Sequence, residues 1–261
     1  MTALPAIFVS HGAPTLAIES SPARDFLVAL GREIDSRFGR PQAVVAVSAH
    51  WETSVPAAST AASPATIHDF GGFPDELYRM RYPAPGAPAT ARDVVGRLAA
   101  AGVEATMDRD RGLDHGAWVP LCLMYPDADV PVTQLSVQPS RDPRYHHRIG
   151  EALRPVREEG VLLLGSGSIT HNLRELSARP AGEAPHVRQF VDWIADRAEM
   201  GDTASLLDYR RLAPHAERNH PTGEHLLPLF VVLGAASSQR LRRIHASVTF
   251  GSLRMDAFAA D

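Results

Sequence analysis

Residues Val161-Leu162-Leu163-Leu164-Gly165 form a short apolar run, which leads through Ser166-Gly167-Ser168-Ile169-Thr170 to His171. A continuous apolar run of this length between turn-forming residues is typical of a strand that is buried on both faces, as in a parallel sheet. Three further runs are rich in β-branched residues and have glycine or proline nearby, which favours strand over helix. They are Ala6–Ser10, Ala43–Ser48 and Val132–Val137.

Segments with helical periodicity lie between these runs. The helix candidates are Ser21–Phe38, Ala89–Ala101, Tyr145–Glu159, Pro185–Met200 and Gly223–Ala236. The last is apolar almost all round, so we expect it to be buried. A final strand is predicted at Ile244–Phe250. The alternation of strands and helices predicts a three-layer α/β/α domain with a central, largely parallel or mixed sheet. We see no repeat or long linker, and therefore expect a single domain over residues 1–261.

Composition excludes several classes of function. All 26 basic residues of the 261-residue chain are arginine, which rules out a Schiff-base lysine and a P-loop lysine. The net charge of −4 argues against nucleic acid and anionic membrane as partners. Cys122 is the single cysteine, so no intramolecular disulfide can form, and we interpret it as buried filler. With no signal peptide or membrane span in the pattern, we expect a cytoplasmic protein.

Five of the twelve histidines stand where a site is expected. His11, His50 and His171 each follow a predicted strand, and the carboxyl ends of parallel strands meet at one edge of a sheet. His225 begins an apolar helix, and His115 lies in a glycine-flanked turn ahead of an apolar segment. Burying an imidazole is costly unless it has a partner, and a metal ion is one such partner. Any one of the five could instead be a hydrogen-bonded structural histidine.

The other histidines carry a weaker signal. Five lie in polar surroundings and are predicted to be surface residues: His146, His147, His186, His215 and His245. His68 and His220 are left undecided. His68 heads the aromatic loop His68–Pro74, which could wall a pocket or simply be a set of buried aromatics.

Other catalytic motifs are missing or incomplete. There is no Gly-x-Ser-x-Gly elbow and no His-Glu-x-x-His zinc motif. Gly165-Ser166-Gly167-Ser168 follows a strand, but it lacks the third glycine of a dinucleotide-binding fingerprint. Scattered histidines at strand and helix ends therefore remain the main signal.

A set of motifs runs in order along nearly the whole chain. It comprises Ser10-His11-Gly12-Ala13-Pro14, Ser48-Ala49-His50-Trp51, Ile67-His68-Asp69-Phe70-Gly71-Gly72-Phe73-Pro74, Tyr82-Pro83-Ala84-Pro85-Gly86, Leu113-Asp114-His115-Gly116-Ala117-Trp118, Met124-Tyr125-Pro126-Asp127-Ala128-Asp129, Gly167-Ser168-Ile169-Thr170-His171-Asn172-Leu173, Asn219-His220-Pro221-Thr222-Gly223-Glu224-His225 and Gly251-Ser252-Leu253. With these motifs the chain resembles the class III extradiol ring-cleavage dioxygenases, specifically their 4,5-DOPA-extradiol-dioxygenase-like branch.

The resemblance implies roles for the same five histidines. It implies a metal held by His11, His50 and His225, with His171 as the acid/base beside the metal or as a fourth ligand. It implies His115 as a second polar group of the substrate pocket. Better-known class III enzymes use two histidines and a glutamate. Here Glu224 and His225 are adjacent, and neighbours on a helix point about 100° apart, so we expect only one to reach the metal. The branch favours His225.

The resemblance also implies an activity. We expect an oxidoreductase that opens the ring of a DOPA-like catechol with O₂ to give a muconic semialdehyde. Fe(II) is expected for catalysis, and Zn(II), which suits imidazole ligands, as a metal that purified protein could hold. Phe70, Phe73, Tyr78 and Tyr82 are expected to wall the ring. The expected partners are a small-molecule catechol and O₂, and the chain is expected to be a monomer or small homo-oligomer. Two alternatives stay open: a Zn-dependent hydrolase and a non-catalytic, Memo-like binding protein.

Overall fold

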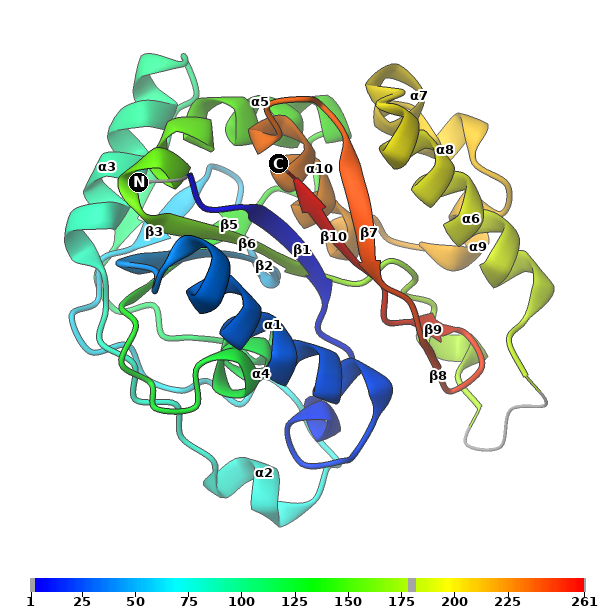
Figure 1. The fold of residues 1–261 in the computed structure, drawn as a ribbon, viewed down its shortest axis with the longest axis horizontal. Coiled ribbons are helices and arrows are strands. Elements are labelled where there is room, and N and C mark those ends of the chain that lie inside the picture. The colour runs from blue at the N-terminus through cyan, green and yellow to red at the C-terminus, as the bar shows by residue number, and fades with distance from the viewer. Residues whose placement is uncertain (1–2, 178–181, 261) are drawn as a thin grey trace.

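A mixed eight-stranded sheet forms the centre of the protein in the computed structural model, which describes residues 3–177 and 182–260 (Figure 1). The strands of this sheet are β1 (Ala6–Ser10), β2 (Ala43–Glu52), β3 (Ala57–Ser59), β4 (Thr106–Asp108), β5 (Val132–Val137), β6 (Val161–Gly167), β7 (Leu241–His245) and β10 (Ala257–Ala260). Their spatial order is β4-β3-β5-β2-β6-β1-β10-β7. Strands β8 (Val248–Thr249) and β9 (Leu253–Arg254) form a separate antiparallel pair.

The inner part of the sheet is parallel. Strand β2 pairs in parallel with both β5 and β6, and β6 pairs in parallel with β1. Antiparallel pairs flank this core, because β3 runs against β5 on one side and β10 runs against β1 on the other. The four apolar runs that predicted strands are the four parallel strands, so the predicted largely parallel or mixed sheet is confirmed.

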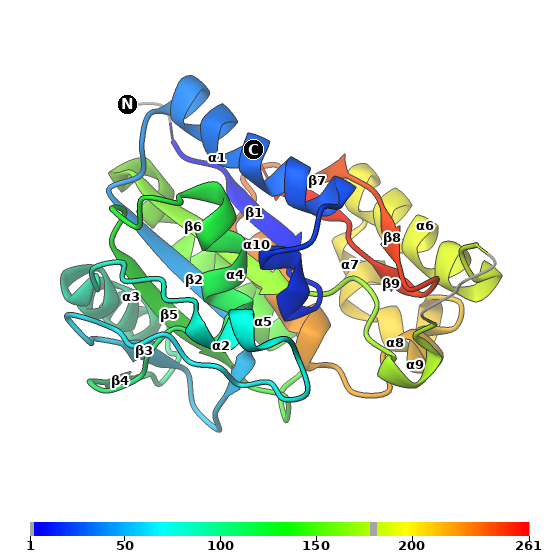
Figure 2. The ribbon, with the colours of Figure 1, turned by 90° about the horizontal axis from the view of Figure 1, so that it is seen from below.

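Helices cover both faces of the sheet (Figures 1 and 2). One face carries α1 (Pro22–Phe38) and α4 (His115–Met124), and the other carries α3 (Pro88–Ala100), α5 (Pro143–Leu153), α6 (Pro185–Met200) and α10 (Leu227–Ala235). Strand side chains alternate between the two apolar layers, as a period of two requires. Val45 and Val47 pack on the α10 side, whereas Val44 and Ala46 pack on the α1 side. This arrangement is the predicted three-layer α/β/α architecture.

Shorter elements connect these layers. They are α2 (Asp75–Arg79), α7 (Thr203–Leu207), α8 (Tyr209–Leu212), α9 (Ala216–Asn219) and 3-10 turns at Pro14–Ala17, Arg154–Glu159, Leu173–Glu175 and Glu224–Leu226. Helix α1 begins as its sequence predicts, because the Ser21 hydroxyl accepts a hydrogen bond from the backbone N–H of Arg24 and Pro22 occupies the first turn. Among the described residues, no helix combines the length and the apolar character that crossing a membrane would require.

Several predicted elements differ from the structure in extent; the predicted helix Gly223–Ala236, for example, is 3-10 over Glu224–Leu226 and α-helical only from Leu227. The predicted final strand Ile244–Phe250 is divided between β7 and β8, and the last strand, β10, begins only at Ala257. Phe250 and Gly251 have φ values of 54° and 76°, so the chain turns there rather than continuing as a strand. The predicted helix Tyr145–Glu159 is α at its start and 3-10 from Arg154, because Pro155 cannot continue the α-helical hydrogen bonds.

Three of the histidines predicted at the surface are buried. His146 is fully buried, with Nδ1–H donating to the Asp142 carbonyl and Nε2 accepting from the Gln138 N–H. His147 is buried on the same helix, α5, which packs against α10, and His186 is buried beside the carboxylate of Glu175. Local polarity misled the prediction, because these rings find partners in segments that are remote or on the same turn. His215 is exposed as predicted, and His245 is half-buried.

Candidate metal centre

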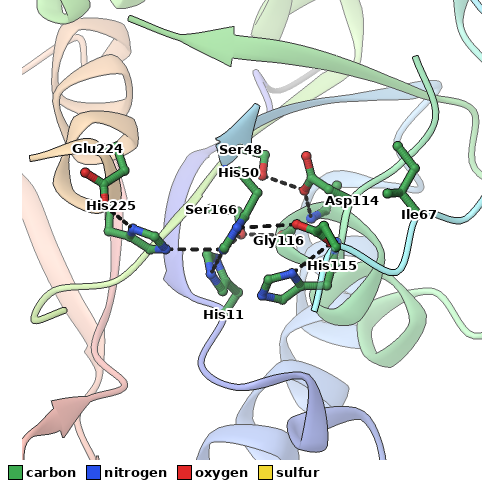
Figure 3. A network of polar contacts seen from close by, with 12 residues as sticks. His11, Ser48, His50, Ile67, Asp114, His115, Gly116, Ser166, Glu224 and His225 are labelled. Atoms are coloured by element: carbon green, nitrogen blue, oxygen red, sulfur yellow. Dashed lines mark hydrogen bonds and ion pairs between the residues drawn. The ribbon is translucent and has the colours of Figure 1, made fainter. Parts of the chain in front are cut away.

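The five singled-out histidines come together at the carboxyl edge of the parallel strands. His11 follows β1, His50 lies near the end of β2, and His171 follows the turn after β6. His115 is the first residue of α4, and His225 lies in the 3-10 turn that precedes α10. Their ring centroids are close: 4.8 Å for His11–His50, 4.0 Å for His50–His115 and 3.3 Å for the stacked pair His171–His225. Figure 3 shows four of these imidazoles gathered around one point.

Three of the rings turn the same nitrogen inward. Nε2 of His50 lies 2.9 Å from Nε2 of His11 and 3.2 Å from Nε2 of His225 (Figure 3). Two nitrogens that each lie about 2.1 Å from a shared metal, at angles of 90–110°, are about 3.0–3.4 Å apart. The two spacings, 2.9 and 3.2 Å, are close to this range, and the ligand atoms of the three rings all lie within 4.8 Å of one another, so the group could hold a single ion.

The outer nitrogen of His11 shows which tautomer the site requires. Nδ1 of His11 lies 3.0 Å from the Ser166 hydroxyl oxygen, and that hydroxyl donates its own hydrogen to the Gly116 carbonyl. The serine oxygen can therefore only accept from His11, so the proton of this ring is on Nδ1. Nε2 of His11 is left with a bare lone pair that points at the other two rings.

In the other two rings, those of His225 and His50, the outer nitrogen Nδ1 faces a carboxylate. Nδ1 of His225 lies 2.8 Å from Oε1 of Glu224, and Nδ1 of His50 lies 3.4 Å from Oδ2 of Asp69. A carboxylate accepts and does not donate, so the hydrogen-bonded ring of His225 carries its proton on Nδ1, and the negative charge of Asp69 favours the same tautomer of His50. Partners of this kind on the outer nitrogen are what orient metal-binding histidines in proteins.

Burial keeps these imidazoles neutral. Burial, and then the neighbouring histidines, lower the pKa of His11 and of His225 well below the ordinary value. The pKa of His50 falls to about 3 for the same reasons, with burial as the larger cause. Three neutral rings then face one another with lone pairs and no proton between them, which is repulsive unless a cation lies among them. The donor set therefore fits a divalent metal that prefers imidazole.

Two further histidines flank the three. His171 is 19% exposed, and burial lowers its pKa, while its Nδ1 lies 3.9 Å from Oε1 of Glu224. His115 is held by Asp69, whose Oδ1 lies 3.0 Å from its Nδ1 and accepts its backbone N–H at 2.9 Å. Asp69 Oδ1 thus contacts His115 while Oδ2 faces His50. Despite its partial burial, the pKa of Asp69 is held at about 2 by these histidine contacts.

A buried polar network joins β2 to α4 beneath these rings. Asp114 caps α4 at Ala117 N–H, accepts the Ser48 hydroxyl at 2.6 Å, and pairs with Arg111 at 2.6 Å. Gly116 is required here, since a Cβ atom at this position would lie 2.6 Å from the Ser48 hydroxyl oxygen and 3.0 Å from the His50 ring. The network explains why β2 and α4 bring His50 and His115 into contact (Figure 3).

A cavity of about 280 Å³ opens over the cluster. Four of the histidines line it, namely His11, His50, His115 and His171, together with Phe70 and Phe73 from the aromatic loop. That loop therefore walls a pocket. Tyr82 does not, because it is 2% exposed in the core and its hydroxyl donates to the Tyr125 carbonyl. Tyr78 packs behind Phe70, with ring centroids 5.3 Å apart, and does not line the cavity.

The sequence matches the family model described as the catalytic LigB subunit of aromatic ring-opening dioxygenase over residues 5–253. The chain belongs to the LigB family. A protein of Beta vulgaris named 4,5-DOPA dioxygenase extradiol is 42% identical to this LigB-family chain, over 92% of the chain and 90% of the relative. A protein of the same name from Escherichia coli strain K12 is 37% identical, over 97% and 93%. An uncharacterized Escherichia coli K12 protein of known crystal structure superposes with a TM-score of 0.82 at 32% identity, covering 99% of this chain and all of that one.

Membership of the LigB family confirms the predicted resemblance and the predicted class of enzyme, a ring-opening dioxygenase. Sequence reasoning missed three residues of this LigB-family site: Asp69, Ser166 and Asp114. Each lies inside a motif quoted for its histidine or glycines, but the contacts that give it a role join segments far apart in the chain. The remaining undecided histidine, His220, is buried behind the site, with Nε2 2.9 Å from the Ile169 carbonyl.

Proposed function

We propose that this protein is a metal-dependent extradiol dioxygenase, which opens the ring of a catechol with O₂ to give a muconic semialdehyde, within one catalytic domain. The convergence of three Nε2 atoms beneath an aromatic-walled cavity, which His11 and His50 line, carries the proposal. Relatives named 4,5-DOPA dioxygenase extradiol support a catechol as the substrate.

His11, His50 and His225 would hold the metal, with Fe(II) as the working ion and Zn(II) as an alternative occupant. When bound, the ion would draw both catechol oxygens to it, lower the pKa of their hydroxyls and bring O₂ beside the ring. Three neutral imidazoles leave its full positive charge in place, which favours an anionic catechol over a neutral one.

Glu224 supports His225 in this arrangement and is not itself a ligand. Its Oε1 lies 2.8 Å from His225 Nδ1 and accepts the Thr222 hydroxyl at 3.0 Å. Both contacts engage Oε1 of Glu224 on the side of the His225 ring that is opposite its Nε2 atom. These contacts support His225, rather than its neighbour Glu224, as the proposed third ligand.

His171 and His115 would move the protons. His171 is neutral near pH 7, since burial lowers its pKa, so it can accept a proton from a catechol hydroxyl at the cavity floor. Asp69 keeps a proton on Nδ1 of His115, which leaves Nε2 of that ring as the atom that exchanges one. Phe70 and Phe73 would pack on the substrate ring and keep bulk water from it.

Oxygen uptake tests the proposal. Metal-free protein would be loaded anaerobically with Fe(II) or with Zn(II), mixed with a panel of catechols, and exposed to air while O₂ and the yellow ring-opened product are followed. Uptake with yellow product from the Fe(II) form alone is expected. Hydrolysis of esters or amides by the Zn(II) form without O₂ uptake would instead favour the hydrolase. If the protein shows neither activity, the Memo-like binding protein becomes the favoured alternative.

A further inference from the structure

The imidazole of His171 is not oriented by a hydrogen bond. The outer nitrogens of His11, His115 and His225 lie 3.0, 3.0 and 2.8 Å from an oxygen atom. Nδ1 of His171 instead lies 3.9 Å from Oε1 of Glu224, which is too far for a hydrogen bond, and within the described residues nothing else bonds to this ring. It stacks on the His225 ring, with centroids 3.3 Å apart. The place of this imidazole therefore depends on where its own backbone lies.

Hydrogen bonds join the backbone that carries His171, which we call the His171 segment (residues 168–175), to the chain that leads to His225. The N–H of Ser168 donates to the His225 carbonyl at 2.9 Å, and the N–H of His171 donates to the Asn219 carbonyl at 2.8 Å. Because one ring is attached to each side of this pairing, its register sets how the two imidazoles face each other.

Glu175 fastens the other end of the His171 segment with its side chain. Its Oε1 accepts from Nε–H of Arg218 at 2.7 Å, and its Oε2 lies 2.7 Å from Nε2 of His186, in the first turn of α6. The Arg218 carbonyl, in α9, accepts from the side-chain amide of Asn172 at 2.7 Å, and Asn172 is the neighbour of His171. The carboxylate thus ties the segment to two helices at once.

This tie is separate from the three rings that would hold the metal. Within the described residues, the Glu175 carboxylate makes no hydrogen bond or ion pair with His11, His50 or His225. Its side chain is 25% exposed and that of Arg218 is 55% exposed, so either can be replaced without opening the core.

We propose, on the basis of the proposed function, that Glu175 is a positioning residue for His171, whose carboxylate holds the His171 segment where the imidazole can take a proton from the substrate. A general base works only within hydrogen-bond reach of that proton. A displacement of about 1 Å can cost about 100-fold in rate, even when its cause lies away from the reacting atoms. Loss of Glu175 should therefore slow turnover without weakening metal binding.

Three variants release the tie to different degrees. Glu175→Ala removes the carboxylate, and in Fe(II)-loaded protein it should lower the kcat for O₂ uptake about 10- to 100-fold. Glu175→Gln keeps an oxygen that can accept from Arg218 but loses the charge, so it should recover part of that loss. Arg218→Gln should lower kcat in the same direction from the exposed side of the pair. Zn(II) affinity, from competition with a chelator, should equal that of wild type in all three.

The His171→Ala background shows whether the effect passes through the imidazole. Glu175→Ala should lower kcat when His171 is present and leave the residual kcat of His171→Ala unchanged, because nothing is left to position. A general structural role would lower both by the same factor. Glu159→Ala is the matched control. Its carboxylate pairs with Arg97 at 2.6 Å, with side chains 55% and 23% exposed, and it precedes β6 at the edge of the sheet opposite the histidines. It should change kcat in neither background.

Hydrogen exchange gives a readout that needs no metal, catechol or O₂. The N–H of His171 is protected by its bond to the Asn219 carbonyl, and it exchanges when the His171 segment opens. In metal-free protein, mass spectrometry of peptides that cover this segment should show exchange on the order of tenfold faster in Glu175→Ala than in wild type. Glu159→Ala should exchange there at the wild-type rate.

The outcomes separate the two proposals. Unchanged exchange of the His171 segment in Glu175→Ala would overturn the positioning role at any level of activity. So would an unchanged kcat, an equal loss of kcat in both backgrounds, or a loss of Zn(II) affinity as large as the loss of kcat. If Glu175→Ala does not fold by circular dichroism, the same criteria apply to Arg218→Gln. Absence of O₂ uptake by wild type with every catechol would overturn the dioxygenase assignment, and the exchange rates alone would then decide whether Glu175 holds the segment.

Discussion

Replacement of Glu224 by glutamine tests which member of the Glu224–His225 pair contacts the metal. The Glu224 carboxylate accepts from His225 Nδ1 at 2.8 Å and from the Thr222 hydroxyl at 3.0 Å, and its side chain is 12% exposed. Glutamine has nearly the same shape and keeps an oxygen that can accept both hydrogen bonds. The substitution therefore removes the negative charge and little else.

The expected loss is moderate if Glu224 acts through His225. A hydrogen bond to an ionised group is about twice as strong as a neutral one, so the ring becomes a weaker donor of its lone pair. Changes of this kind beside a metal-binding histidine typically lower metal affinity about 10- to 100-fold, or about 1.4–2.8 kcal/mol. His225→Ala removes the nitrogen itself and should cost considerably more.

Competition with a chromophoric chelator would measure the Zn(II) affinity of wild type, Glu224→Gln and His225→Ala, with circular dichroism as the check on folding. Thr222→Val is a useful control, because it removes the second hydrogen bond to Glu224 and leaves the charge. If Glu224→Gln loses metal as completely as His225→Ala, or if His225→Ala keeps it, Glu224 is the ligand and the tautomer argument is wrong.

Three further predictions follow from other contacts of the site and the core. His171→Ala should retain its metal but lower kcat by about 10²- to 10⁴-fold, as loss of a general acid/base does; metal content as low as in His11→Ala would make this residue a ligand instead. Asp69→Asn replaces a carboxylate that faces two imidazoles by an amide with a single acceptor oxygen. Metal affinity should therefore fall about 10- to 100-fold, and kcat should fall with it. A variant that equals wild type in chelator competition and in O₂ uptake would contradict the assigned contacts. Burial lowers the pKa of His146 and of His220 to about 4, whereas both titrate near 6.5 in the unfolded chain, so protons favour unfolding between these values. The free energy of unfolding should be fully present above pH 6.5 and fall toward pH 4 by up to about 3 kcal/mol for each histidine, and urea unfolding at a series of pH values should show a slope that His146→Gln reduces.

The hydrophobic pattern of the sequence predicted the bounds of elements well where an element must bury a continuous run or one face of its side chains. Strands Ala6–Ser10 and Val132–Val137 and the helix Pro185–Met200 begin and end where the sequence placed them. Continuous apolar runs have no stable alternative to burial, and a period of 3.6 matches only a helix. The end of the chain was predicted less well, because the turn at Phe250 needs a left-handed backbone conformation at a phenylalanine, and only the glycine that follows it, Gly251, indicates a turn.

The sequence by itself determined which elements form and, through strand-end placement and motif resemblance, that five histidines share a site. It could not determine what each imidazole contacts on its outer nitrogen. Ser166 lies 155 residues from His11, and Asp69 lies 46 residues from His115. Hydrogen bonds across such separations exist only after the layers have packed, since packing alone brings the two segments within reach. Tertiary structure therefore decided what each outer nitrogen contacts, and with it which side of each ring faces the centre of the cluster.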